Sequence, residues 1–278
     1  MENASDIPYL PVSEVSKILT DEECPLVSVL IPCYKRREFI SLMLTNIVQM
    51  DYPKSKIEVC ILQDGPEDLL NQEEQLFFKK QSGCKLNYKY EKDIRRSIGE
   101  KRNKLVKMAS HKICVSMDSD DIYFNTYIRY SVSALKQYKV GITSSAQMLF
   151  VYPHYGNKIT GIRCGHKHQG HEACCVFTKK HFKSMGGFIS RGEHGNQGEG
   201  VKMIAFNEKN MVNLDIKKLM VCVVHRGENG NTIDKDRFKD ANVEGDLTGM
   251  PQFECLKRIL AHHGEGPANQ NQSQTSRA

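Results

Sequence analysis

Apolar runs of strand length alternate with amphipathic stretches over the first half of the chain. The strand-like runs are VSVLIPCY (27–34), IEVCILQD (57–64), KLNYKY (85–90) and the start of KICVSMDSDD (112–121). The stretches between them have helical periodicity and read REFISLMLTNIVQM, EDLLNQEEQLFFKK and SIGEKRNKLVKMAS. Such alternation is typical of βαβ units. It predicts an α/β fold with a mainly parallel central sheet flanked by helices.

Helix-capping residues support this division. Ser97 precedes Glu100 by three residues, as in a capping box. Asn125 stands where it can cap the helix TYIRYSVSALKQY. We therefore expect helices to begin at these two places.

The second half has strands with longer connections. Its apolar runs are ITSSAQMLFVY (142–152), ACCVFT (173–178) and KLMVCVVH (218–225), with a helical stretch over GEGVKMIAFNEK (198–209). A segment rich in Gly and His lies near 161–171, and a Gly-rich loop covers 186–200. We expect this half to carry the more variable part of a site.

Both ends of the chain have a composition that differs from the middle. Residues 1–24 are polar and punctuated by prolines, and the last residues are rich in Gln, Asn and Ser. Such segments bury too little apolar surface to order by themselves. We therefore expect a loose N-terminal tail (1–24), one domain (25–240), and a C-terminal helix with a disordered tail (241–278).

Composition limits the class of partner. A chain of 278 residues with 40% hydrophobic content can bury one sizeable core. The formal charge of +6 is modest and spread along the chain, which suits anionic ligands such as nucleotides. We expect no nucleic acid polymer as a partner.

Cysteine usage and the N-terminus bear on location. Several of the ten cysteines, among them Cys33, Cys60, Cys114 and Cys222, lie inside apolar runs, where cysteine behaves as a small hydrophobic residue. The N-terminus lacks a basic start followed by an apolar stretch, and no segment has the roughly 18 uninterrupted apolar residues of a membrane span. We expect a soluble cytoplasmic protein without an integral membrane span.

Polar residues end three of the predicted parallel strands, at the edge where ligands gather in open sheets. The first strand ends in Pro32, Cys33 and Tyr34, and the second ends in Asp64. Tyr34 offers an aromatic face to a base, and Asp64 can accept hydrogen bonds from a base or ribose. Ordinary loop polarity explains either residue equally well.

The run Asp118, Ser119, Asp120, Asp121 is more specific. Three carboxylates within four residues repel one another unless a cation is present. Mg²⁺ and Mn²⁺ prefer oxygen ligands and also bridge phosphate oxygens. The run therefore predicts a divalent metal site, whereas a turn or helix cap would need only one aspartate.

The chain resembles the inverting GT-A glycosyltransferases of family 2 over roughly residues 25–232. The resemblance is carried by VSVLIPCYKR, ILQDGPED, KRNKLVKMASHKICVSMDSDD, CCVFTKKHFKSMGGF, GNQGEGVKM and VVHRGENGNT, in this order. It implies a GT-A Rossmann-like fold and transfer of a sugar, with inversion, from a nucleotide-sugar donor that is often UDP-linked. The acceptor would be a hydroxyl of a glycan, a protein or a small molecule.

The resemblance also implies residue roles. Pro32, Tyr34, Asp64, Arg102, Asp118 and Ser119 would bind the nucleotide. Asp120, Asp121 and His225 would contact Mn²⁺ or Mg²⁺, with Asp120 or Asp121 as the direct ligand.

The general base is implied to be Glu199, although the family more often has Glu-Asp where this chain has Gly198, Glu199 and Gly200. Glu193 in the same loop competes for this role or belongs with His171 to an acceptor pocket. A glutamate near a helix start is also explained by the helix dipole alone.

Three other functions remain open. Cys164, His166, His168, His171, Cys174 and Cys175 could form a zinc module, although they lack the usual pair of CxxC motifs. A nucleotidyltransferase would also use acidic metal ligands, but it should carry a Gly-rich loop after the first strand, where PCYKRRE has no glycine. The third is a non-catalytic nucleotide-sugar-binding protein on the same fold.

Overall fold

The centre of the molecule is a seven-stranded sheet, counted within the residues that the computed structural model describes: 11–164, 170–192, 195, 198–204, 210–225, 238–240 and 245–262. Its strands are β1 (Val27–Tyr34), β2 (Ile57–Gly65), β3 (Lys85–Lys92), β4 (Ile113–Ser116), β6 (Ile142–Ser144), β9 (Val176–Thr178) and β10 (Met211–Asn213). They lie in the order β10-β6-β9-β4-β1-β2-β3, and only β9 runs antiparallel to its neighbours. The predicted α/β fold with a mainly parallel sheet is confirmed.

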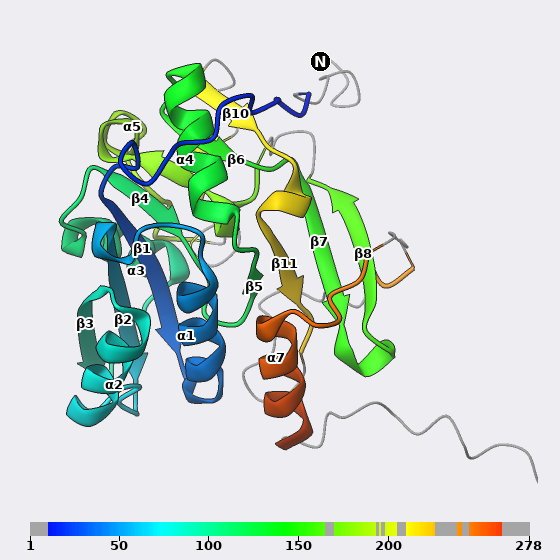
Figure 1. The fold of residues 1–278 in the computed structure, drawn as a ribbon. Helices are drawn as coiled ribbons and strands as arrows, with labels where there is room; N and C mark the ends of the chain where they lie inside the picture. The colour runs from blue at the N-terminus through cyan, green and yellow to red at the C-terminus, as the bar shows by residue number, and fades with distance from the viewer. Residues whose placement is uncertain are drawn as a thin grey trace, which may run out of the picture.

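Helices cover both faces of this sheet. They are α1 (Ile40–Gln49), α2 (Gln72–Ser82), α3 (Ile98–Met108), α4 (Tyr127–Tyr138), α5 (Lys179–Ser184) and α6 (Val201–Ile204). Successive residues of a strand point to opposite faces. In β1, Val29 and Ile31 accordingly pack into the core with α1, α2 and α4, whereas Leu30 packs into the core with α3 and α6. Figure 1 shows α1 and α2 on the face toward the viewer.

A second, four-stranded sheet, again within the described residues, stands beside the first (Figure 1). It has the order β5-β11-β7-β8 and consists of β5 (Ile122–Tyr123), β7 (Gln147–Tyr152), β8 (Lys158–Arg163) and β11 (Met220–Val223). The apolar run 142–152 therefore splits into strands of two different sheets. The C-terminal helix α7 (Pro251–His262) packs against α1 and β5.

The predicted helix starts have mixed outcomes. The Ser97 hydroxyl accepts a hydrogen bond from the Glu100 backbone N–H at 3.2 Å, as expected, but the Glu100 carboxylate pairs with Arg96. Asn125 is not the cap of α4, because the N-cap residue is Thr126, and its hydroxyl donates to Lys218 instead. The helix predicted from residue 67 begins only at α2, where Asn71 forms a complete capping box.

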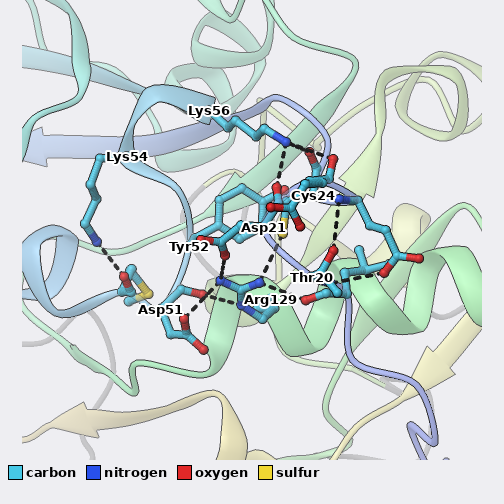
Figure 2. A network of polar contacts seen from close by, with 12 residues as sticks. Thr20, Asp21, Cys24, Asp51, Tyr52, Lys54, Lys56 and Arg129 are labelled. Carbon is cyan, nitrogen blue, oxygen red and sulfur yellow. Dashed lines mark hydrogen bonds and ion pairs between the residues drawn. The ribbon is translucent and has the colours of Figure 1, made fainter.

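The expectation of a loose N-terminal tail is wrong for residues 11–24. Arg129 of α4 contacts this segment, with Asp21 at 2.5 Å and the backbone oxygen of Leu19 at 2.8 Å. Figure 2 shows Asp21 beside Arg129. Lys56 donates to the backbone oxygens of Asp21, Glu22 and Cys24. Leu19 and Cys24 are buried. Composition missed this because the order comes from α4 and the loop before β2, which supply partners from elsewhere in the sequence.

All ten cysteines lie within the described residues, where each is a free thiol and nine are buried. This agrees with their position in apolar runs. Among the helices in the described part of the chain, none combines the length and the apolar character that crossing a bilayer requires.

Candidate active site

The three aspartates of the DSDD run, which begins two residues after β4, send their carboxylates to different partners. Asp118 contacts Arg102, Asp120 contacts His225, and Asp121 accepts a hydrogen bond from the backbone of β11. Within the described residues, no three His, Cys, Asp or Glu side chains come together as a metal-binding group. The expectation that the aspartates gather around one cation is not met by this arrangement.

Arg102 joins Asp118 to Glu199. Its Nε donates to Glu199 Oε1 at 2.7 Å and its Nη2 donates to Asp118 Oδ1 at 2.9 Å. Burial alone would lower the pKa of Arg102, but the two carboxylates raise it above the usual value, so the guanidinium stays charged. Nη1 is buried and has no hydrogen-bond partner in the described structure. The structure therefore brings the predicted base and the first aspartate of the DSDD run to the same guanidinium.

Asp120 is the meeting point of a second group. Its Oδ2 lies 2.9 Å from His225 Nε2 and 3.1 Å from Arg36 Nη2. Lys35 has a left-handed φ of 49° directly after β1, and this sharp turn precedes Arg36. The His225 ring packs 5.0 Å from the Phe39 ring, centroid to centroid. The first strand, the DSDD run and the end of β11 thus converge on one carboxylate oxygen.

Asp121 has a structural environment. Its carboxylate is buried and accepts a hydrogen bond from the Val223 N–H at 2.9 Å, while its backbone oxygen accepts one from Asn46 at 2.9 Å. These contacts fasten β11 and α1 to the end of β4. The assignment of Asp121 as a metal ligand finds no support in this geometry. Ser119 is also buried and lies beside the Cys33 thiol.

The ends of β1 and β2 form a third part of the site. Asp64 is fully buried and accepts hydrogen bonds from Lys101 Nζ at 2.8 Å and from the Arg96 N–H at 2.7 Å. The Arg95 guanidinium lies 3.3 Å from the centre of the Tyr34 ring. Both predicted nucleotide contacts therefore lie at one edge of the sheet, surrounded by cations.

Pro32 lies beyond the last β1–β4 pair, Leu30 with Ser116, and is paired in register only with β2. Since proline has no N–H to donate, this position costs the sheet little. Pro32 is part of the buried strand that leads to Tyr34.

Sequence reasoning missed two residues of the site. Tyr123 of β5 accepts a hydrogen bond from the Asp118 N–H at 2.7 Å and donates to Ala173 at 2.9 Å, which fixes the end of β4. Glu172 accepts one from the Gly200 N–H at 3.3 Å, next to Glu199. The signal for Glu172 was its place beside His171, at the start of a strand. Tyr123 gave none, since its hydroxyl partners are backbone atoms.

The remaining candidates are only partly described. His171 lies next to Glu172, and its backbone oxygen accepts hydrogen bonds from the Ser144 hydroxyl and the Cys174 and Cys175 thiols. Glu193, His166 and His168 lie outside the described residues, so the zinc module and the competition between Glu193 and Glu199 stay as predictions.

Two solved structures have a similar fold. The mannosyltransferase PcManGT from Pyrobaculum calidifontis, in complex with GDP-Man and Mn²⁺, is 18% identical with a TM-score of 0.52 over 82% of this chain and 63% of that chain. S. aureus TarS 1–349, in complex with UDP-GlcNAc, is 15% identical with a TM-score of 0.56 over 87% of this chain and 73% of that chain. This chain thus spans less than two thirds of the length of PcManGT. These likenesses confirm the predicted GT-A fold.

The family is shown by a separate match. No curated protein sequence matches this chain. The family model described as glycosyl transferase family 2 matches residues 28–183, which is more than half of the 278 residues and includes most of β1, the DSDD run and β9. The chain therefore belongs to glycosyl transferase family 2.

Proposed function

We propose that this protein transfers a sugar from a nucleotide-sugar donor, with UDP as the expected nucleotide, to a hydroxyl of a glycan, protein or small molecule, with inversion. The observation that carries the proposal is that two aspartates of the DSDD run contact two different groups of residues, which we call the Asp120 arm and the Asp118 arm. One arm joins Asp120 to His225 and Arg36, and the other joins Asp118 through Arg102 to Glu199. Displacement at a sugar carbon needs charge stabilisation on the leaving side and a base on the attacking side.

The Asp120 arm has the donor set for Mn²⁺ or Mg²⁺. Asp120 Oδ2 and His225 Nε2, a carboxylate oxygen and an imidazole nitrogen, are 2.9 Å apart, within hydrogen-bond distance, and both are atoms that bind metal ions in proteins. Such ions are commonly held by one or two protein ligands together with substrate phosphates. When bound, the ion would neutralise the charge that develops on the leaving diphosphate. Arg36 would add a second positive charge at the same place.

The ends of β1 and β2 would receive the nucleotide. Tyr34 supplies an aromatic ring, and Asp64 fixes Lys101 and the Arg96 backbone beneath it. The buried Arg102 Nη1, which has no hydrogen-bond partner in the described structure, is a donor available to a ligand oxygen. TarS with UDP-GlcNAc and PcManGT with GDP-Man show that this fold accepts either nucleotide.

Glu199 would act as the base. It takes the proton from the acceptor hydroxyl while that oxygen forms the bond to the anomeric carbon. The bond from this carbon to the diphosphate oxygen breaks, and its electron pair stays on the diphosphate. A single displacement of this kind inverts the anomeric centre.

The test is a screen of nucleotide sugars, with UDP-sugars and GDP-mannose, in Mn²⁺, in Mg²⁺ and in chelator. We expect release of nucleoside diphosphate from at least one donor in the presence of metal, and its loss in chelator. Absence of turnover and of binding with every donor would contradict the proposal. Binding without turnover in any acceptor mixture would favour a non-catalytic nucleotide-sugar-binding protein.

Asp120→Ala separates the metal arm from folding. We expect turnover to fall by about 10³-fold while the urea midpoint stays close to that of the unchanged protein. Asp240→Ala, which removes an exposed carboxylate, is the matched control and should keep full turnover. Full activity of Asp120→Ala would remove the metal assignment.

The free, mostly buried thiols favour a reducing compartment. We therefore propose a cytoplasmic location. Fractionation of cells that produce the protein tests this.

A further inference from the structure

Glu172 lies close to the proposed base and has no role in the mechanism above. It belongs to the short turn Glu172–Cys174 before β9, and its Oε1 accepts a hydrogen bond from the Gly200 N–H at 3.3 Å. Gly200 directly follows Glu199. The carboxyl group of Glu172 therefore contacts the backbone directly after the proposed base, Glu199.

The identity of residue 200 reflects this contact. A Cβ at position 200 would stand 2.3 Å from Cγ of Glu172, much closer than atoms can approach. The backbone of Gly200 has no left-handed φ, so its conformation alone does not require glycine. The Glu172 side chain occupies the space that any larger residue at 200 would need.

Charge in this cluster is unbalanced. Arg102 is the one cation among the described residues that pairs with Glu199 or Asp118 by an ion pair, and Glu172 has no ion-pair partner there. Three carboxyl groups therefore share one guanidinium. Burial, followed by the charge of Glu199, raises the pKa of Glu172 to about 7, and the charge of Arg102 opposes this.

The cysteine thiols around Glu172 stay neutral near pH 7. Burial raises the pKa of Cys174 to about 11, and it also raises the pKa of Cys164 and Cys175 above the usual value. The groups that face Glu172 in the described structure are Glu199, Arg102, Cys164, Cys174 and Cys175, with His171 next to it in the chain. In this cluster, burial and the charge of Glu199 place the pKa of Glu172 near neutrality.

We propose that Glu172 is a positioning residue for Glu199: it holds the backbone at Gly200, and the negative charge of its carboxylate favours transfer of the acceptor proton to Glu199. A negative charge close to a carboxylate favours the protonated form of that carboxylate, which makes it a stronger base. Glu172 itself neither gains nor loses a covalent bond in the reaction. This inference rests on the proposed function, because it assigns Glu199 the role of base.

The experiment compares the pH dependence of turnover in Glu172→Gln and the unchanged protein. Glutamine has the shape of protonated glutamic acid and can still accept the Gly200 hydrogen bond. At pH 6 we expect equal turnover within about twofold, because Glu172 is mostly protonated there. At pH 8 the variant should be slower by about tenfold, since a group with a pKa near 7 changes from about 10% to about 90% ionised between these values. Coincident profiles of the two proteins would overturn the proposal.

Two further variants test positioning. Gly200→Ala should displace Glu172 and slow turnover by about tenfold at pH 8, and combining it with Glu172→Gln should add little further loss, since both act through one contact. Glu73→Gln, an exposed carboxyl of α2, is the matched control and should keep the original profile. Full activity of Gly200→Ala at every pH would rule out the positioning role.

A readout without substrate keeps the inference separate from the proposed function. Because the pKa of Glu172 is raised on folding, its contribution to stability is present below its unfolded pKa of about 4.5 and is lost as pH rises through about 7. The urea midpoint of Glu172→Gln should therefore rise relative to the unchanged protein between pH 5 and pH 8. If no donor is turned over but this shift is found, the proposed function fails and the environment of Glu172 stands. A constant difference in midpoint across this range contradicts the shifted titration itself.

Discussion

Arg102 and Arg129 each bind two carboxylates, at opposite edges of the main sheet. Arg129 lies near the amino ends of β1 and β2, and its Nε, Nη1 and Nη2 all donate to partners on the N-terminal segment or the loop before β2 (Figure 2). Its partners Asp21 and Asp51 have side chains that are 67% and 58% exposed. Arg102 lies at the carboxyl edge, and its partners Asp118 and Glu199 are 26% and 7% exposed.

The two arginines differ in whether all their nitrogens have hydrogen-bond partners. Every nitrogen of Arg129 has a hydrogen bond, whereas Nη1 of Arg102 is buried without one in the described structure. A buried donor without a partner costs stability, so it is usually kept for a reason other than stability. Arg129 therefore stabilises the fold by holding the N-terminal segment, whereas Arg102 is part of the candidate active site. The following variants test this division.

The largest expected effect is on Glu199, the partner of Arg102. Glu199→Gln removes the proposed base but keeps a hydrogen-bond acceptor for Arg102. We expect turnover to fall by about 10³-fold, with donor affinity changed by less than about twofold. Single-turnover kinetics and donor titration measure the two quantities separately. Equal loss of both would assign Glu199 to donor binding.

Arg102→Lys should be next in size. A lysine ammonium cannot hold two carboxylates in the fixed fork of a guanidinium. We expect a loss of turnover of about 10²-fold in a protein that remains folded by circular dichroism. Activity close to that of the unchanged protein would mean that charge alone is needed there, without the fork.

Arg129→Met should have the reverse pattern. The buried backbone oxygen of Leu19 would lose its donor, which corresponds to a loss of about 2–3 kcal/mol in the free energy of unfolding. Turnover of the folded protein should stay within about twofold, because none of the contacts of Arg129 reaches the site. Urea unfolding and a donor assay on the same sample check both. A selective loss of turnover at unchanged stability would show that the two edges are coupled.

Asp21→Asn should have the smallest effect. The side chain is exposed, and exposed ion pairs contribute about 0–1 kcal/mol. We therefore expect a change in the urea midpoint near the limit of detection, and a smaller one at high salt. A loss as large as that of Arg129→Met would mean that this ion pair, rather than the hydrogen bonds to the backbone, holds the N-terminal segment.

The regular part of the fold could be predicted from the sequence because its signals are local. The strand runs at 27–34 and 57–64 match β1 and β2 within one residue. The second half resisted prediction because β6 and β7 lie in one apolar run but pair with different partners, β9 and β11. Such pairing depends on residues distant in the sequence.

The site was predictable to the same degree. Asp64 lies at the end of β2 and Asp120 in the turn after β4, close to where the pattern placed the strand ends, and Arg102 meets Glu199 across 97 positions of the chain. The pattern could not reveal that Asp121 turns toward β11, nor why residue 200 is glycine. The first depends on the direction of the Asp121 side chain, and the second on a contact from Glu172 in another segment.

Within the residues that the structure describes, the main sheet ends on one side at β3, which pairs with β2. An edge strand of this kind presents unpaired backbone groups to solvent and can recruit a strand of another molecule. Lys85, Lys89 and Lys92 of β3 are exposed. If two such edges came together, the lysines of the two molecules would repel one another. They therefore disfavour edge-to-edge aggregation at the high concentrations used for purification and storage.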